Sequence, residues 1–139
     1  MSSWLYQGKP VSPELIEDHI GFCYQITNLV NGKKYIGKKL LKFTRTKKPL
    51  KGRTRNRKTV VPSDWETYYG SNKDLCADVE RHGTDKFKRE ILRFCRSKSE
   101  CNYWEAKLQF ASDAIISENY YNDWISVKVH RNKTLDNRS

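Results

Sequence analysis

The pattern of hydrophobic and polar positions changes at Gly21, where residues that favour strands begin. β-Branched and aromatic residues dominate residues 21–28 and recur at 33–37, a composition that favours strands. Asn31-Gly32 lies between the two stretches and supplies the positive-φ pair that a tight hairpin turn needs. The pattern therefore predicts an antiparallel hairpin with one tyrosine on each strand.

Two further elements are predicted after the hairpin. Residues 72–82 should form a helix, because Ser71 can cap its start and Gly83 can end it. Residues 87–94 alternate well enough for a third strand, and the face that carries Phe94 is expected to meet the core at the end of that strand. The chain is therefore expected to mix strands with helices.

The longest predicted helix covers residues 99–116 and opens with a capping box of Ser97 and Glu100. Its apolar stripe consists of Cys101, Trp104, Leu108, Ala111 and Ile115. Glu105 lies on this inward stripe, and carboxylates are almost never buried unpaired. Two interpretations follow: Glu105 pairs with a Lys or Arg at the edge of the stripe, or it binds a hard divalent cation.

The pattern also divides the chain into segments. Residues 1–20 are expected to form an N-terminal extension made of a loop and a short helix that begins at Ser12-Pro13. Residues 21–129 form the predicted domain, since 139 residues can bury one core but not a second full domain. Residues 130–139 are polar and are expected to form a flexible tail.

Charge narrows the choice of partner. The chain holds 27 Lys and Arg against 16 Asp and Glu, a formal charge of +11 that favours nucleic acid over other partners. An anionic membrane is the competing partner, but the chain has no run of 18 apolar residues and no secretory segment. Its four cysteines are scattered without a C-x-x-C pair, which favours buried thiols over structural zinc. A cytoplasmic protein that binds no membrane is expected.

Most of the excess charge lies in residues 42–58, which hold nine Lys and Arg and no acid. Such a run is by itself typical of a solvated or disordered loop. Directly after the hairpin, a basic loop is expected to lie along DNA phosphates. The expected DNA-binding residues are Lys38, Lys42, Lys47, Lys48, Lys51, Arg53, Arg55, Arg57 and Lys58.

The two halves of the hairpin resemble the signature of the GIY-YIG endonucleases. Tyr35-Ile36-Gly37 matches the second half, and Phe22-Cys23-Tyr24 keeps the tyrosine of the first half while its first two residues differ. The similarity covers about residues 21–124 and continues through Tyr69-Gly70-Ser71, His82-Gly83, Phe87, Ile91-Leu92, Glu105 and a Tyr-Asn pair. The resemblance implies a small α/β domain with a central three-stranded antiparallel sheet flanked by helices.

The resemblance also implies an activity. The family resemblance implies a small, stand-alone endonuclease of the phage or mobile-element type. Such an enzyme hydrolyses double-stranded DNA with Mg²⁺, or with Mn²⁺ as a substitute. The host cell is then a bacterium or a phage-infected cell. The chain has no separate DNA-recognition domain by this comparison, so specificity is expected from the basic loop, the terminal extensions, a homodimer or an accessory partner.

The site residues are likewise implied by the resemblance. They are Tyr24, Tyr35, the structural glycine Gly37, the metal ligand Glu105 and Asn122. Arg45, ten residues after Tyr35, fits the family's basic residue; Arg53, Arg55 and Arg57 are rivals, and Lys39 is expected to share the role. Either tyrosine would deprotonate a water, which a phenol of pKa about 10 can do only beside cations.

Several residues keep a second interpretation. A lone asparagine in a polar stretch such as Asn122 is usually a turn residue. Trp65, Tyr68 and Tyr69 either stack on bases or pack in the core. At the level of function, the alternatives are a non-catalytic nucleic-acid-binding protein on a degenerate nuclease scaffold, and an RNA-binding or structural protein. Retention of both tyrosines with Glu105 favours the nuclease.

Overall fold

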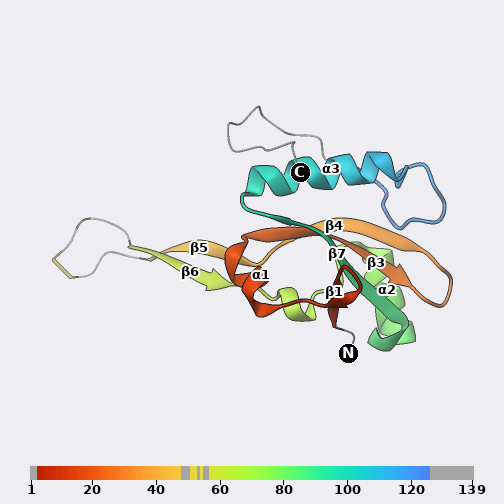
Figure 1. Cartoon of the computed structure of the whole chain (residues 1–139), viewed down its shortest axis with the longest axis horizontal. Helices are drawn as coiled ribbons and strands as arrows, with labels where there is room; N and C mark the ends of the chain where they lie inside the picture. The colour runs from red at the N-terminus through yellow and green to blue at the C-terminus, as the bar shows by residue number, and fades with distance from the viewer. Residues whose placement is uncertain (1–2, 48–50, 53, 55–56, 126–139) are drawn as a thin grey trace.

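The computed structural model describes residues 3–47, 51–52, 54 and 57–125 (Figure 1). Its centre is a five-stranded sheet with the order β2-β1-β7-β3-β4. The strands are β1 (Trp4–Tyr6), β2 (Lys9–Pro10), β3 (Gly21–Asn28), β4 (Lys34–Leu40) and β7 (Phe87–Cys95). β3 pairs antiparallel with both β4 and β7, whereas β1 pairs parallel with β7. β4 is therefore an edge strand.

Helices cover both faces of this sheet. They are α1 (Pro13–Asp18), α2 (Lys73–His82) and α3 (Lys98–Ala111), with short 3-10 helices at Trp65–Thr67 and Thr84–Lys86. Figure 1 shows α3 along one side of the sheet and α2 on the other. The larger core cluster, which is rich in aromatic residues, packs on the α2 side, and a smaller cluster of three cysteines and Trp104 packs under α3.

The predicted fold class is confirmed, but the sheet has five strands and not three. The added strands come from the N-terminal segment, which was expected to be a loop and a short helix. Trp4 explains their position, because its buried indole packs edge-on against Phe22 and Tyr24 and donates a 2.7 Å hydrogen bond to the carbonyl of Trp65. This packing holds β1 against β7.

The hairpin forms as predicted, with a different turn. β3 has the predicted bounds, and β4 extends three residues beyond the expected end. Of the pair expected to have positive φ, only Gly32 does, at 78°. Asn31 instead accepts the N–H of Lys33 on its side-chain oxygen, and the connection is a five-residue loop closed by the bond from Asn28 N–H to Lys33 C=O.

The face of β7 that meets the core was predicted correctly only for Phe94, at the end of the strand. Phe87 and Ile91 are buried, whereas Leu92, on the face expected to be inside, is exposed. The pairing with β3 shifts register between Cys23 and Tyr24, which is the mark of a β-bulge. The shift explains why Phe94 joins the same core cluster as Ile91 although the two are an odd number of residues apart.

Both long helices begin close to their predicted starts. The cap of α2 is Asn72 and not Ser71, since the Asn72 side chain accepts the N–H of Leu75, and Gly83 ends this helix with a φ of 90°. Ser97 caps α3 as predicted by accepting the N–H of Glu100. α3 ends at Ala111, five residues early, and the chain turns at Asp113, whose φ is 53°.

The basic segment is not a simple loop. β5 (Lys42–Lys47) and β6 (Arg57–Pro62) pair as an antiparallel ribbon, which projects from the domain in Figure 1. Lys42 donates to the carbonyl of Glu17, and Lys51 is exposed. The side chains of the other basic residues in this segment lie outside the described residues, so their DNA contacts stay predictions; they are Arg45, Lys47, Lys48, Arg53, Arg55, Arg57 and Lys58.

The expected tail at 130–139 lies outside the described residues. No helix within the described ranges is long and apolar enough to cross a membrane.

Candidate active site

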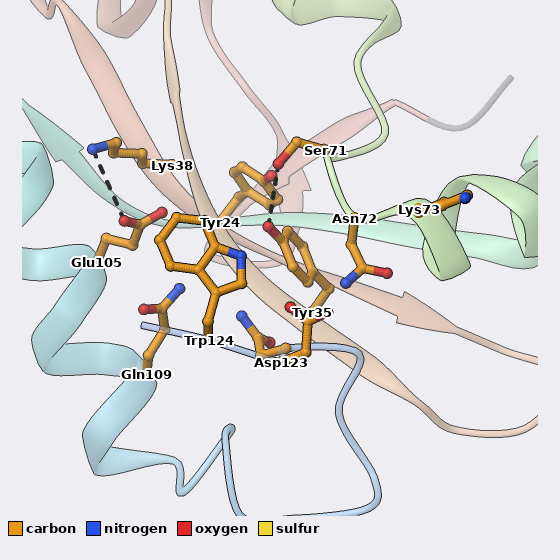
Figure 2. A pocket seen from close by; sticks show the side chains of 11 residues that line it. Tyr24, Tyr35, Lys38, Ser71, Asn72, Lys73, Glu105, Gln109, Asp123 and Trp124 are labelled. Atoms are coloured by element: carbon orange, nitrogen blue, oxygen red, sulfur yellow. Dashed lines mark hydrogen bonds and ion pairs between the residues drawn. The ribbon is translucent and has the colours of Figure 1, made fainter. Parts of the chain in front are cut away.

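A pocket of about 420 Å³ lies beside the edge strand β4, between the start of α2 and the middle of α3 (Figure 2). Five of the residues singled out from the sequence line it: Tyr24, Tyr35, Lys38, Glu105 and Asn122. They come from three elements, β3, β4 and α3, and from the segment after α3. The fold therefore gathers most of the expected catalytic set at one place.

The two tyrosines meet across the hairpin. Tyr24 on β3 lies directly opposite Gly37 on β4, and Tyr35 lies opposite Ile26, which places both phenols on the same face of the sheet. Their ring centroids are 6.1 Å apart. The hydroxyl of Tyr35 lies 3.3 Å from that of Ser71, in the loop before α2. The pair thus spans from the core to the wall of the pocket.

Both phenols hold their protons tightly. Tyr24 is only 1% exposed, and burial raises its pKa well above the ordinary value, with Tyr68 and Tyr35 adding to the effect. Burial also raises the pKa of Tyr35, but the hydrogen bond with Ser71 acts in the opposite direction. Tyr35 is therefore the easier of the two to ionise, and either would need added positive charge nearby.

Glu105 projects from α3 into the pocket, with 16% of its side chain exposed. Burial raises its pKa, and Lys38 opposes this rise through both its charge and its backbone N–H. The Lys38 ammonium lies 3.9 Å from Glu105 Oε1 and also donates to Asn102, one turn earlier on α3. Both interpretations of Glu105 therefore have support: it pairs with a lysine, and it also faces the pocket.

Asn122 binds the backbone of the edge strand. Its Oδ1 accepts the N–H of Ile36 at 3.0 Å, and its Nδ2 donates to the carbonyl of Ile36 at 2.8 Å. Gln109, one turn after Glu105 on α3, donates to the same carbonyl at 2.9 Å. Asn122 is thus buried and not a simple turn residue: its amide pairs with β4 as a neighbouring strand would.

Tyr121 fixes the position of Asn122. Its N–H donates to the carbonyl of Lys34 at 2.7 Å, which extends the pairing along the outer edge of β4. Its hydroxyl donates to Asp78 on α2 at 2.6 Å and accepts from Asn28 on β3 at 2.9 Å. The segment after α3 is therefore tied to β3, β4 and α2 at once.

Of the two basic residues expected to act in catalysis, Lys39 does not line the pocket and Arg45 cannot be placed relative to it. Lys39 binds Asp64 at 2.6 Å, and its ammonium lies 4.1 Å from the ring centroid of Tyr68. Arg45 pairs with Thr59 in the β5–β6 ribbon, but its side chain lies outside the described residues. Their catalytic roles stay predictions.

The aromatic cluster before α2 belongs to the core. Tyr69 is buried, and Trp65 and Tyr68 pack against the larger cluster. Tyr68 stands edge-on to Tyr24, with centroids 6.0 Å apart. Core packing is therefore the interpretation that the structure supports for these rings, and Tyr68 helps to position the catalytic candidate Tyr24.

The sequence interpretation missed six residues that line the pocket: Ser71, Asn72, Lys73, Gln109, Asp123 and Trp124. Gln109 lies four residues after Glu105, so helical spacing could have found it. Asp123 and Trp124 follow Asn122 directly. Asp123 is a second carboxylate at the pocket, whereas Glu105 alone was expected. Among the described residues, no three His, Cys, Asp or Glu side chains gather into a metal cluster.

Comparison with known proteins identifies the family of the chain. A family model described as "Putative endonuclease segE, GIY-YIG domain" matches residues 4–125. "Putative endonuclease segE" of Enterobacteria phage T4 is 32% identical over 101 residues, which are 73% of this chain and 39% of that relative. No solved structure matches the chain significantly. Since the family match runs from β1 to the residue after Trp124, the chain belongs to the segE-type GIY-YIG endonuclease family.

Proposed function

We propose that this chain is a metal-dependent DNA endonuclease that hydrolyses backbone phosphodiesters in the pocket beside β4. The observation that carries the proposal is the convergence of one carboxylate, one lysine and two phenols on a single pocket: Glu105, Lys38, Tyr24 and Tyr35. A carboxylate for a cation, an ammonium for a phosphate and a phenol for proton transfer are the groups that such a hydrolysis requires.

The residues of the pocket fit Mg²⁺. This ion keeps several waters and binds through one or two carboxylates together with substrate phosphates. Glu105 supplies a carboxylate whose charge is disfavoured by burial, and Asp123 lines the same pocket. Bound Mg²⁺, or Mn²⁺ in its place, would polarise a phosphoryl oxygen and stabilise the leaving 3′-oxygen.

The side chains have separate tasks. Lys38 contacts the phosphate as a point charge when Glu105 engages the metal. Tyr35, in the phenolate form that the Lys38 ammonium and a bound cation would favour, takes the proton of the attacking water. The water oxygen then bonds to phosphorus as the bond to the 3′-oxygen breaks. Tyr35 suits this task better than Tyr24, because it is less buried and its bond to Ser71 opposes the rise in its pKa that burial causes. Arg45 and Lys39 are the remaining candidates for offsetting negative charge.

The substrate is double-stranded DNA, to which the basic ribbon adds affinity. Residues 42–58 contribute nine positive charges and no negative ones, and the ribbon begins two residues after β4 ends. Contacts of this kind go to phosphates and weaken as salt rises. Cleavage is therefore expected to fall with increasing salt even where the pocket is intact.

A cleavage assay tests the proposal. Supercoiled plasmid is incubated with wild-type protein, with Glu105→Gln, and with Glu100→Gln as a matched change on the same helix outside the pocket. Wild type and Glu100→Gln should cut in Mg²⁺ and stop in EDTA, while Glu105→Gln should lose about 100-fold or more. The proposal would be contradicted if Glu105→Gln cut DNA at the wild-type rate, or if the wild type cut DNA equally fast in EDTA. DNA binding without any cleavage would support the non-catalytic alternative.

A further inference from the structure

Trp124 stands at the mouth of the pocket. It is 71% exposed, whereas Trp4 and Trp104 are buried and Trp65 is half-buried. Figure 2 shows its indole between Glu105 and Gln109 on one side and Tyr35 on the other. The most exposed tryptophan of the chain thus shares its pocket with the proposed catalytic groups.

The exposure of Trp124 indicates a ligand because the side chain lies at the pocket. Single exposed apolar residues are common on protein surfaces and do not by themselves indicate a binding site. Trp124 differs because its large apolar ring lines a pocket whose other side chains are all polar or charged, the two tyrosines included. No aromatic ring in the described part of the chain stacks on the indole. An apolar ring that is 71% exposed is costly to leave in water, and a planar apolar partner would cover its exposed part.

We propose that the indole of Trp124 stacks on an unpaired nucleobase of the DNA, beside the phosphate that is cleaved. The inference rests on the proposed function, since it deepens the substrate of the same site. Two lysines of the same pocket supply the phosphate contacts: Lys38 on β4 and Lys73 at the start of α2. Cations for the backbone combined with an aromatic face for the base are the usual means of holding single-stranded DNA.

The inference limits the substrate class. A base inside a duplex is already stacked on its neighbours, so it can meet the indole only after it leaves the helix. Leaving costs least where the base is already unpaired, as at a fork, a flap or a single-stranded tail. Stacking accepts every base, so the preference is for structure and not for sequence. The chain should therefore bind and cut branched DNA better than fully paired DNA.

Binding to a defined fork tests this without requiring cleavage. A fluorescein-labelled fork and a fully paired duplex of equal length are titrated with protein in Ca²⁺ without Mg²⁺, and anisotropy gives each Kd. Trp124→Ala should weaken fork binding by about 5- to 150-fold and leave duplex binding within about twofold. Trp124→Phe should restore most of the loss. Phe110→Ala removes an exposed aromatic residue of α3 outside the pocket, and it should change neither Kd.

A second fork, whose unpaired arm carries abasic sugars, isolates the base. On this DNA, wild type and Trp124→Ala should bind equally, because phosphates remain and bases are gone. The inference would be overturned if Trp124→Ala lost affinity equally for the fork, the duplex and the abasic fork. It would also be overturned if Trp124→Ala bound the fork with the wild-type Kd. The outcome is separate from the cleavage test: fork binding that depends on Trp124 without cutting in Mg²⁺ would contradict the endonuclease proposal alone.

Discussion

The phenol of Tyr24 lies directly over the α-carbon of Gly37. A Cβ built on Gly37 would stand 2.6 Å from the hydroxyl oxygen and 2.8 Å from Cζ of Tyr24, and 3.0 Å from Cε2 of Tyr35. The two residues are also cross-strand partners of β3 and β4. The glycine of the signature is therefore required for space, because it lets one phenol cross the strand and reach the pocket beside the other.

Gly37→Ala should consequently damage both the fold and the site. Tyr24 cannot move aside easily, since its ring is in edge-on contact with Trp4 and Tyr68. We expect a loss of about 1–3 kcal/mol in the free energy of unfolding, as for an overpacked core. Cleavage by the fraction that remains folded should fall about 100-fold, because the phenols are displaced. Urea unfolding and plasmid cleavage measure the two effects.

A double variant identifies the contact responsible. Adding Tyr24→Phe removes the oxygen nearest to the new methyl group, so it should return part of the stability that Gly37→Ala loses. If the stability losses of Gly37→Ala and Tyr24→Phe simply added in the double variant, this explanation of the glycine would be wrong.

Asn122→Asp should convert the amide that binds β4 into a pH-dependent contact. One carboxylate oxygen can still accept the N–H of Ile36, but the other would face the Ile36 carbonyl that now accepts from Nδ2. Repulsion and burial would raise the pKa of the new carboxyl group in the folded protein. A raised folded pKa means that stability falls as pH rises above the ordinary pKa of aspartate.

The variant should thus approach wild-type stability at pH 4, where a protonated carboxyl group can donate to Ile36, and lose about 2–3 kcal/mol at pH 8. Asn122→Ala is the control: it lacks both bonds and should show no such difference between the two pH values beyond that of wild type. A pH-independent deficit in Asn122→Asp would rule out the bonding scheme. Unfolding in urea at both pH values gives the comparison.

Local chemistry explains which elements were predictable from the sequence. The bounds of β3, the Ser97 cap of α3 and the Gly83 end of α2 depend on residues within a few positions of each other, and all three predictions are confirmed. The positions of Tyr24 and Tyr35 on paired strands follow from the same local hairpin. Glu105 could be singled out because helical periodicity alone places it on an inward face.

The errors come from contacts between distant residues. β1 exists because Trp4 packs on residues of β3 and beside Arg89 of β7, and nothing in its own three-residue stretch requires a strand. The bulge opposite Cys23 and Tyr24 changes which side chains of β7 face inward, and alternation alone cannot locate a bulge. Lys73 and Trp124 reach the pocket only through the docking of α2 and of the last described segment, so no local pattern marked them.

Arg89 should prove more important for stability than its position on a strand indicates. It is buried, and its guanidinium donates to the carbonyls of Glu66 and Tyr68 at 2.9 and 2.8 Å. The rings of Trp4 and Tyr69 lie 4.6 and 4.2 Å from its Cζ. Arg89 therefore fastens the loop that carries Tyr68 against Tyr24.

Arg89→Met should lower the free energy of unfolding by about 3 kcal/mol or more, because two carbonyls lose a charged donor in a buried place. Arg81→Met is the matched control: Arg81 is an exposed residue that lies 3.7 Å from Asp78, and its loss should cost less than about 0.5 kcal/mol. Similar stability of the two variants in urea unfolding would show that Arg89 is not needed to hold this loop.

Glu105 should show a conflict between stability and function. Burial raises the pKa of Glu105, so the folded protein binds its proton more tightly than the unfolded chain does. Stability therefore declines as the pH rises from the ordinary pKa of glutamate through the raised pKa of Glu105. At pH 8 the wild type bears the full free-energy cost of burying the ionised carboxylate.

Glu105→Gln removes this cost, so we expect the variant to match wild type at pH 4 and to unfold at a higher urea concentration at pH 8, although it should not cut DNA. Adding Mg²⁺ at pH 8 should stabilise wild type by mass action and leave the stability of Glu105→Gln unchanged. The difference in stability between the two proteins should then become smaller or change sign. Equal Mg²⁺ stabilisation of both proteins would place the ion away from Glu105. A variant less stable than wild type at pH 8 would mean that the ion pair with Lys38 outweighs the cost of burying the carboxylate.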